Sequence, residues 1–437
     1  MHIRLFNIVK VLIISATLGI AISYGPFYLF HGVLIYFFIM LFFWINQSKY
    51  KIKLPIVQPR YHYIFFFVFF WYMLSIFWSV YPAYSIIYIF YIFCGVTVSL
   101  AIVYFVNDIL KLKSIFKVIA LVFIIEILLS LLEVYTAFRF PISPFSPYAQ
   151  YFLRAPGDFT AFSLEIQKYI ESLPTGFRWN PNNLAATMCI VLPFFLFHKK
   201  NWVKYLGCIS VLTIIHATDS RGGILAGLFI FVCYFLIYSR YYKKFLNSFI
   251  ILFILWGGLS VFNIFENSIQ NNIFTSIQES ITATQVFLFN EIEPNASIGI
   301  RQRLIHNGFA ALKGTYGLGV GGGGSMWIQE SDPTLTISSM HNFWVELLVE
   351  GGVIFFVIFI SWYMMLFLHL YRIYYNINNS DLEYFSGSCS LALLGFIPAA
   401  ISPSGCIYLL PMWILFGFSV STLVIAAKHR KADKISC

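Results

Sequence analysis

Arg221 is one of a few residues whose type and position could support chemistry on an anion. It lies in Asp219-Ser-Arg-Gly-Gly223, a turn at the start of an expected helix. A cation at a helix N-terminus opposes the helix dipole, so we expect an anion to offset it. Asp219 is one candidate for that anion, and a bound phosphate is the other. Arginine suits phosphate because its planar, permanently charged group grips two oxygens at once.

Arg301 and Arg303 form a second basic pair, at the head of a helix expected over 300–313. The pair predicts an anion site if it lies beside Arg221, whereas a solvated helix face is the ordinary alternative. The glycine run Gly317–Gly324 follows. It succeeds no strand and precedes no Lys-Ser/Thr, which excludes a dinucleotide fingerprint and a P-loop. Its N–H groups, with Gly319 and Gly321 as candidates, could approach an anion as a nest, or the run could be a flexible connector.

His341 stands at the N-terminal edge of an expected long helix, where the positive helix end favours the neutral imidazole. A neutral ring can accept a proton, so His341 is a candidate general base, with a purely structural role as the alternative. Glu346 and Glu350 share one face of the following helix, well away from the direction of His341. Inside a membrane these carboxylates need partners, so we expect them to face the bundle or a cavity.

Amide side chains cluster in Arg178-Trp-Asn-Pro-Asn-Asn183. Asn182 or Asn183 would cap the next helix, which could account for the motif by itself. Amides also hydrogen-bond sugar hydroxyls, so they are candidates for substrate binding. The candidate substrate-binding residues outside the glycine run are Arg178, Asn180, Asn182, Asn183, Arg303 and Asn342. No segment between expected helices gathers histidines and carboxylates at metal-ligand spacing, so we expect neither a metal nor a cofactor.

The elements that must position these residues are membrane helices. Apolar residues make up 59% of the 437 positions and charged residues 11%, which is typical of an all-α integral membrane protein. Runs long enough to cross a bilayer predict about twelve transmembrane helices. They lie near 8–24, 29–46, 62–80, 83–106, 114–137, 183–198, 202–218, 222–239, 245–265, 343–371, 386–402 and 406–427.

The basic residues predict the orientation of these spans. Of the 28 Lys and Arg residues, 20 fall in one alternate set of loops and termini and eight in the other. Basic residues favour the cytoplasmic side, so both termini are expected in the cytoplasm and the first helix is expected to be an anchor. The net charge of +10 follows from this sidedness and requires no nucleic acid partner.

The eight remaining basic residues lie in three loops expected outside the cytoplasm, over 138–182, 218–222 and 266–342. The first loop is proline-rich and carries an amphipathic pattern, which predicts a helix on the membrane surface or over the span ends, as a lid or spacer. The apolar positions of that helix are Phe159, Phe162, Ile166, Ile170 and Leu173. We expect one polytopic domain over 1–437, in which 266–342 is the catalytic loop. None of the seven cysteines falls in the long outer loops, so no disulfide framework is expected.

Several motifs, taken in their order along the chain, resemble those of the O-antigen ligase and polysaccharide polymerase superfamily. The resemblance is closest to the teichuronic acid and O-antigen type polymerases. They are Thr175-Gly-Phe-Arg-Trp-Asn-Pro-Asn-Asn-Leu-Ala185, Asp219-Ser-Arg-Gly-Gly223, Arg301 with Leu304-Ile305 and Asn307-Gly308, Gly317-Leu-Gly-Val-Gly321 and His341-Asn-Phe-Trp-Val-Glu-Leu-Leu-Val-Glu-Gly-Gly352. The resemblance covers 175–352 by motif and the whole chain by topology. The chain departs from the pattern at Gly322–Ser325, where relatives commonly place Asn or Phe.

The resemblance implies an inverting, metal-independent glycosyltransferase of the GT-C type in the bacterial inner membrane. It would act outside the cytoplasm on oligosaccharide repeat units linked to undecaprenyl diphosphate, both as donor and as acceptor, and a chain-length regulator is a candidate partner. By this resemblance, Arg221 and Arg301 would hold the donor diphosphate and His341 would activate the acceptor hydroxyl. Fixed cations can stabilise a departing diphosphate without ATP or metal, which agrees with the residues themselves.

Two alternatives stay open. A ligase would transfer finished glycan to a lipid or another acceptor, and the motifs do not separate it from a polymerase. A secondary transporter of saccharides or lipid-linked saccharides would carry ionisable residues in its spans, for which Glu126 and Glu133 are candidates beside Glu346 and Glu350. A transporter would give the long outer loop no task, and the sequence shows none of the internal repeats common in such folds.

Overall fold

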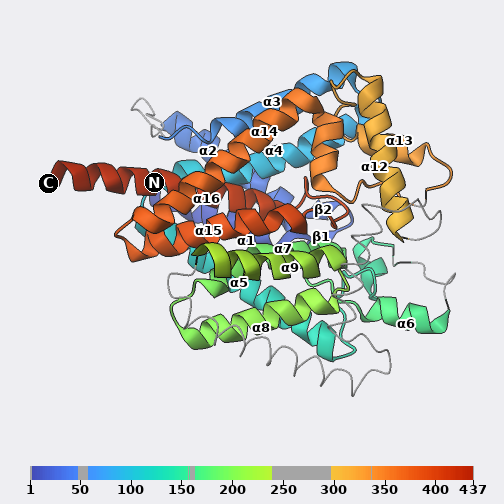
Figure 1. Cartoon of the computed structure of the whole chain (residues 1–437), viewed down its shortest axis with the longest axis horizontal. Helices are drawn as coiled ribbons and strands as arrows, with labels where there is room; N and C mark the ends of the chain where they lie inside the picture. The colour runs from blue at the N-terminus through green and yellow to red at the C-terminus, as the bar shows by residue number, and fades with distance from the viewer. Residues whose placement is uncertain are drawn as a thin grey trace.

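The structure is a computed structural model that describes residues 2–47, 58–155, 157, 163–238, 297–335 and 337–436. Within these ranges it is an all-α bundle with one short β-hairpin, β1 (Ser23–Tyr24) and β2 (Phe27–Tyr28), and this confirms the predicted fold class in outline (Figure 1). The helices are α1 (His2–Leu18), α2 (Leu29–Gln47), α3 (Tyr63–Ser75), α4 (Pro82–Phe105), α5 (Ile109–Tyr135), α6 (Leu164–Ser172), α7 (Pro181–Leu196), α8 (Asn201–Ala217), α9 (Arg221–Cys233), α12 (Ser297–Gly314), α13 (Gly324–Glu330), α14 (Phe343–Asn376), α15 (Ser380–Ala399) and α16 (Leu410–Ser436).

Seven of the described helical segments are long and apolar enough to cross a membrane. They lie at Leu29–Asn46, Pro82–Phe105, Ile109–Tyr135, Arg221–Tyr238, Phe343–Asn376, Ser380–Ala399 and Leu410–Arg430, and three shorter apolar helices accompany them. A helix therefore forms at eleven of the twelve predicted spans, but the count of twelve crossings is not confirmed. The predicted span over 245–265 lies outside the described residues.

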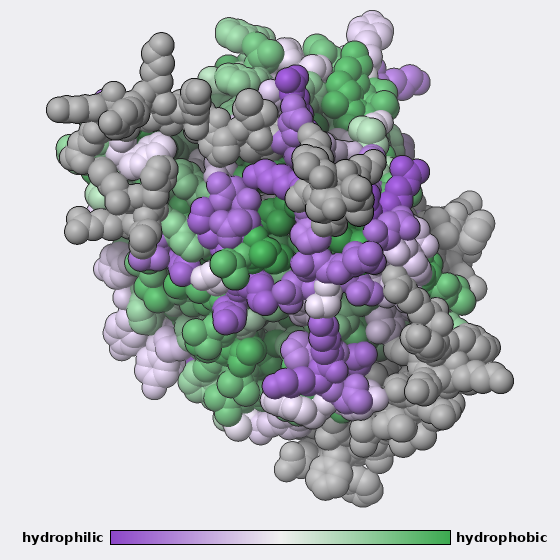
Figure 2. Space-filling model, turned by 90° about the vertical axis from the view of Figure 1, so that its left-hand side faces the viewer, coloured by the Kyte–Doolittle hydropathy of each residue, from purple (hydrophilic) through white to green (hydrophobic). Residues whose placement is uncertain are grey.

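The two chain ends lie at one end of the bundle, and α6, α12, α13 and the β-hairpin lie at the other (Figure 1). Seen from the end that carries the termini, the surface bears a band of hydrophilic side chains among hydrophobic ones (Figure 2). The loops that hold the candidate residues therefore gather at the end away from the termini. Which of the two ends faces the cytoplasm stays a prediction from the basic residues.

Tight packing of small residues holds the centre of the bundle. Helix α15 packs against α7, α9, α14 and α16, and α16 packs against α4. Ser386, Gly387, Ser388, Cys389 and Ser390 of α15 are all buried. A Cβ atom on Gly387 would come within 2.7 Å of the Tyr374 ring, so the close approach of α15 to α14 depends on glycine. Small residues allow such close contact between membrane helices.

A kink in α14 connects the bundle to the glycine run. Gly352 has φ 82° and ψ 174°, which interrupts the helix. The carbonyls of Val349 and Glu350 accept hydrogen bonds from the N–H groups of Val320 (2.9 Å) and Gly321 (3.1 Å), and Val353 N–H donates to Gly317 O (2.9 Å). The backbone groups freed by the kink are thus satisfied by the glycine run. The sequence did not predict this kink, and it ties the loop that precedes His341 to the helix that follows it.

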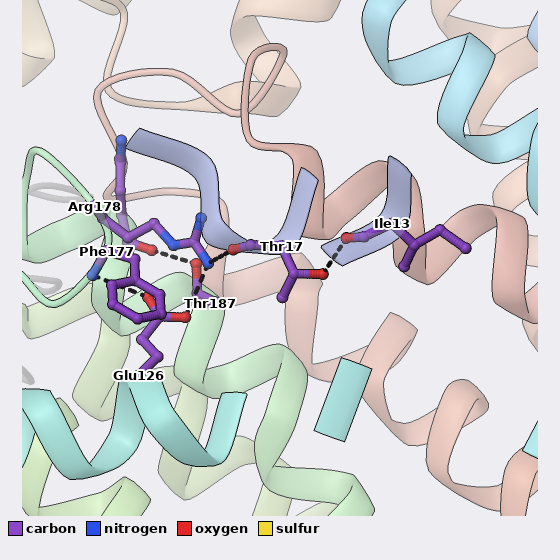
Figure 3. Close-up of polar contacts among 7 residues, drawn as sticks. Ile13, Thr17, Glu126, Phe177, Arg178 and Thr187 are labelled. Atoms are coloured by element: carbon purple, nitrogen blue, oxygen red, sulfur yellow. Dashed lines mark hydrogen bonds and ion pairs between the residues drawn. The ribbon is translucent and has the colours of Figure 1, made fainter. Parts of the chain in front are cut away.

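Two carboxylates of α5 anchor the end of the first long loop. Glu133 accepts hydrogen bonds from the backbone N–H groups of Thr175 (2.9 Å) and Gly176 (2.7 Å). Glu126 forms an ion pair of 2.9 Å with Arg178, which also donates to Thr17 O in α1 (Figure 3). A buried carboxylate is tolerated only with such partners. These contacts fix the start of α7 relative to α1 and α5.

Candidate functional site

Arg221 is the first residue of α9, and two neighbours set its position. Ser220 caps the helix by accepting a hydrogen bond from Gly223 N–H (3.3 Å). The glycines after Arg221 let α9 approach its surroundings closely, since a Cβ atom on Gly222 would lie 2.7 Å from Ser402 Cβ. Asp219 adopts φ 52°, a left-handed conformation that asparagine and aspartate tolerate better than most residues. The Arg221 side chain is exposed, so an anion can reach it.

Arg301 lies in the first turns of α12, which confirms the helix predicted over 300–313. Leu304 of this helix is fully buried, and Asn307 donates to Asp332 (2.9 Å) and Gln329 (3.2 Å). Gln329 in turn donates to Leu304 O (2.8 Å). These contacts fasten α12 to α13 and to the segment that follows it. Arg301 is therefore carried by a packed element of the long loop.

His341 precedes α14 in a left-handed conformation with φ 48°. For a residue with a side chain this conformation costs on the order of 1 kcal/mol, and such strain is found preferentially at functional sites. Its Nδ1 lies 3.1 Å from the carbonyl oxygen of Ser402. Because a carbonyl oxygen only accepts, Nδ1 must carry the hydrogen when the ring is neutral. Nε2 is then the atom that can accept a proton.

The charges of the two arginines act on their neighbours. Burial lowers the pKa of Arg301, and the charge of Arg221 lowers it further. Burial also lowers the pKa of His341; the hydrogen bond to Ser402 raises it, and the charge of Arg301 lowers it again. Arg301 therefore lies within electrostatic reach of both Arg221 and His341. The site combines two positive charges with an imidazole whose pKa lies below its usual value.

Ser402, between α15 and α16, connects the parts of this site, and the sequence did not reveal it. Its hydroxyl donates to Asn182 Oδ1 (2.9 Å) and accepts from Ser220 Oγ (3.2 Å), while its carbonyl accepts from His341. It thus joins the starts of α7, α9 and α14. The only signal in the sequence was the Ser-Pro-Ser-Gly turn at 402–405, which marks a loop without indicating contacts over long distances in the chain.

Two of the predicted asparagines, Asn180 and Asn342, cap helices. Asn180, with Pro181 after it, caps α7, so the prediction of Asn182 or Asn183 as the cap was wrong by half a turn or more. Pro181 suits the first helical position, which starts the helix earlier than the apolar pattern suggested. Asn342 caps α14 by accepting from the N–H groups of Trp344 and Val345. Asn183 is buried, and its Oδ1 has no partner within the structure.

Other predicted site residues have partners of their own within the structure. Arg178 is 5% exposed and neutralised by Glu126. Arg303 donates to Thr334. In the glycine run, the N–H of Gly319 donates to Thr315 Oγ1 (3.2 Å) and that of Gly321 to Glu350 O. Because these N–H groups are already bonded, a phosphate nest formed by Gly319 and Gly321 has no free donors in this arrangement. We therefore give the run a structural role.

Glu346 and Glu350 do have partners inside the bundle, as expected. Glu350 accepts from Ser325 Oγ of α13 (2.7 Å), and Tyr72 lies 3.4 Å from its other oxygen. Tyr88 donates to Glu346 (3.2 Å). Glu126 and Glu133 connect a loop to α5, whereas Glu346 and Glu350 connect α14 to other helices. Within the described ranges, no group of three or more His, Cys, Asp or Glu side chains could hold a metal ion.

Two comparisons with known proteins show what the sequence is similar to. Residues 206–360 match the sequence model of the O-antigen ligase family. The chain is also 22% identical over 279 residues to the teichuronic acid biosynthesis protein TuaE of Bacillus subtilis; the match covers 60% of this chain and 54% of the relative, so the chain spans about half the length of that protein. The family match contains Arg221, Arg301 and His341 but not the Arg178–Asn183 segment. These similarities confirm the predicted resemblance.

Proposed function

Since the chain carries the sequence features of the O-antigen ligase and polymerase superfamily, we propose that it is a glycosyltransferase of surface polysaccharide synthesis. Its reaction would join oligosaccharide repeat units carried on undecaprenyl diphosphate, as a polymerase. The observation that carries this proposal is that Ser402 bonds both His341 and Ser220, the residue before Arg221, while Arg301 lies within electrostatic reach of Arg221 and His341. The bilayer and the two lipid-linked substrates are the partners that the proposal requires.

In the proposed reaction, an acceptor hydroxyl oxygen attacks C1 of the donor sugar from the face opposite the diphosphate, which inverts the configuration. The bond from C1 to the phosphate oxygen breaks, and the lipid diphosphate leaves with both bonding electrons. Arg221 and Arg301 stabilise the negative charge that develops on it, without a metal. The proton of the hydroxyl passes to Nε2 of His341, whose Nδ1–H remains bonded to Ser402.

We further propose that this site lies on the outer face of the inner membrane and that both termini are cytoplasmic. The distribution of basic residues supports this orientation. The separation of the termini from α12 and α13 along the bundle supports it as well (Figure 1).

A ligase is the second candidate function, because the match to the O-antigen ligase family accommodates it. Deletion of the gene followed by gel analysis of the surface glycan distinguishes the two. Loss of a polymerase leaves single repeat units on the final acceptor. Loss of a ligase leaves polymer on the lipid carrier. If the glycan is unchanged in length and attachment, both functions are excluded.

A further inference from the structure

A cavity of about 350 Å³ lies beside the proposed catalytic site. We call it the aromatic pocket, and its lining includes Tyr28, His31, Tyr91, Arg154, Trp179 and Asn183. These residues come from the hairpin and the start of α2, from α4, and from the first long loop with the start of α7. Ligand pockets of proteins typically combine such apolar and aromatic walls with a few polar groups.

Arg154 gives the aromatic pocket a positive charge. Its guanidinium lies 5.1 Å from the Trp179 ring centre and 5.6 Å from that of Tyr28, and Nη2 donates to Ser23 Oγ and Gly25 O, both at 3.0 Å. No acidic side chain lines the pocket. In the described part of the chain, Arg154 forms no ion pair, whereas the charge of Arg178 is neutralised by Glu126. An anion in the pocket would therefore meet an uncompensated cation.

Three buried polar atoms of the lining residues lack a hydrogen-bond partner in the structure. They are Nε of Arg154, Nε of Arg178 and Oδ1 of Asn183. Arg178 and Asn183 are each only 5% exposed. Buried donors and acceptors are nearly always paired, so such a group suggests a ligand or water that completes it. Two donors and one acceptor suit a molecule that carries both carboxylate oxygens and hydroxyl groups.

Rings in the lining favour a sugar over a simple anion. The C–H face of a pyranose is weakly positive and packs on the negative face of an aromatic ring. The pocket also adjoins the catalytic site, because Asn180 and Asn183 line it while Asn182 of the same turn bonds Ser402. Ser404, two residues after Ser402, lines it too. A glycan could therefore occupy both places at once.

We propose that the aromatic pocket binds an acidic sugar residue of the glycan, at a distance from the bond being formed. Its carboxylate pairs with Arg154, and its ring packs against the aromatic side chains of the lining. This inference rests on the proposed function for the role of the pocket in catalysis. The binding of the sugar itself can be measured without any turnover.

The test uses the full chain in nanodiscs and saturation-transfer NMR. The probes are a tetragalacturonate and the same tetrasaccharide with its carboxylates reduced to alcohols. We expect the acidic probe to bind and the reduced probe to bind at least about tenfold more weakly. Arg154→Gln should weaken the binding of the acidic probe by a similar factor. Lys168→Gln, an exposed charge of the same loop outside the pocket, should leave binding unchanged.

Inorganic phosphate is added as a competitor of the acidic probe, to distinguish a sugar site from a general anion site. This control needs no variant. Displacement of the acidic probe by phosphate at equal concentration would overturn the sugar site, as would equal binding of both tetrasaccharides or no binding by the acidic one. Thermal unfolding of Arg154→Gln shows whether that variant is folded. If the acidic probe binds but no polymer is made, the proposed function is rejected and the sugar site is kept. If polymer is made but the probe does not bind, the sugar site is rejected and the proposed function is kept.

Discussion

Replacement of Arg221 tests the grip on the diphosphate. In Arg221→Lys a point charge replaces the planar fork, so two oxygens can no longer be held together. Loss of one such contact in an active site lowers the rate by about 10²-fold or more. We expect a comparable loss of polymer synthesis, measured with purified protein and a lipid-linked repeat unit.

The matched control is Arg372→Lys, at the end of the bundle where the carbonyl of residue 372 bonds Arg430. This variant should keep normal activity. A normal polymer from Arg221→Lys would reject the role of Arg221.

The pH dependence tests His341 as the base. Burial and the charge of Arg301 lower the pKa of His341 below the usual 6.5. A base works in its neutral form, which is present above its pKa, so lowering the pKa extends activity toward acid. We expect kcat/KM to be constant from pH 8 to about 6.5 and to fall only below that. In His341→Ala the residual activity should lose this acid limb. An acid limb above pH 7 in the wild type would contradict the assignment.

Some of these residues could be chosen from the sequence because residues of their type are rare in the loops where they lie. Only eight basic residues fall outside the set expected in the cytoplasm, so Arg221 and Arg301 were distinctive, and His341 was distinctive at a helix start. Ser402 could not be found, since a serine in a turn has no distinctive pattern and its contacts are far away in the chain. Arg178 could be chosen as a basic residue, but its pairing with Glu126 could not be predicted, because Glu126 lies 52 residues away on α5.

At the scale of helices, the approach of α9 to the α15–α16 connection positions Arg221. In Gly222→Ala the new methyl group would meet Ser402 Cβ at 2.7 Å, so the connection that holds His341 must shift. Overpacking of this kind costs about 1–3 kcal/mol. We expect a lower melting temperature in detergent and a clear loss of activity.

Gly227→Ala is the matched control on the same helix, because its nearest neighbours would be Leu212 and Ile215 at 3.8 and 3.9 Å. Alanine in a helix interior is favoured over glycine by about 0.5–1 kcal/mol, so this variant should be at least as stable as the wild type. Equal effects of the two substitutions would reject close packing at Gly222 as the cause.

Hydropathy predicted the helices well because a membrane helix needs a long apolar run whatever its neighbours are. It could not predict the kink of α14, since Gly351-Gly352 within an apolar run is compatible with a straight helix. The kink exists because the glycine run pairs with the freed carbonyls of Val349 and Glu350. The same pairing engages the N–H groups of Val320 and Gly321 in the glycine run, which the sequence suggested could bind an anion.

At the scale of the whole molecule, the proposal requires a definite orientation in the membrane. We expect cysteines introduced at the exposed positions Lys168 and His306, in a chain without native cysteines, to react with an impermeant reagent on intact spheroplasts. A cysteine at Asn376, exposed at the opposite end of α14, should react only after permeabilisation. The reverse pattern would place Arg221, Arg301 and His341 in the cytoplasm and reject the proposed substrate.

Glycosyl transfer from a lipid diphosphate is tested most directly by reconstitution. The purified chain would be incubated with one lipid-linked repeat unit, without added metal and with EDTA, and the products separated on a gel. The account predicts a ladder of polymers with release of the lipid diphosphate. The ladder should be lost in His341→Ala and retained in His306→Gln, a substitution at an exposed position of α12. An equal ladder from His341→Ala, or no ladder from folded wild-type protein, would contradict the account.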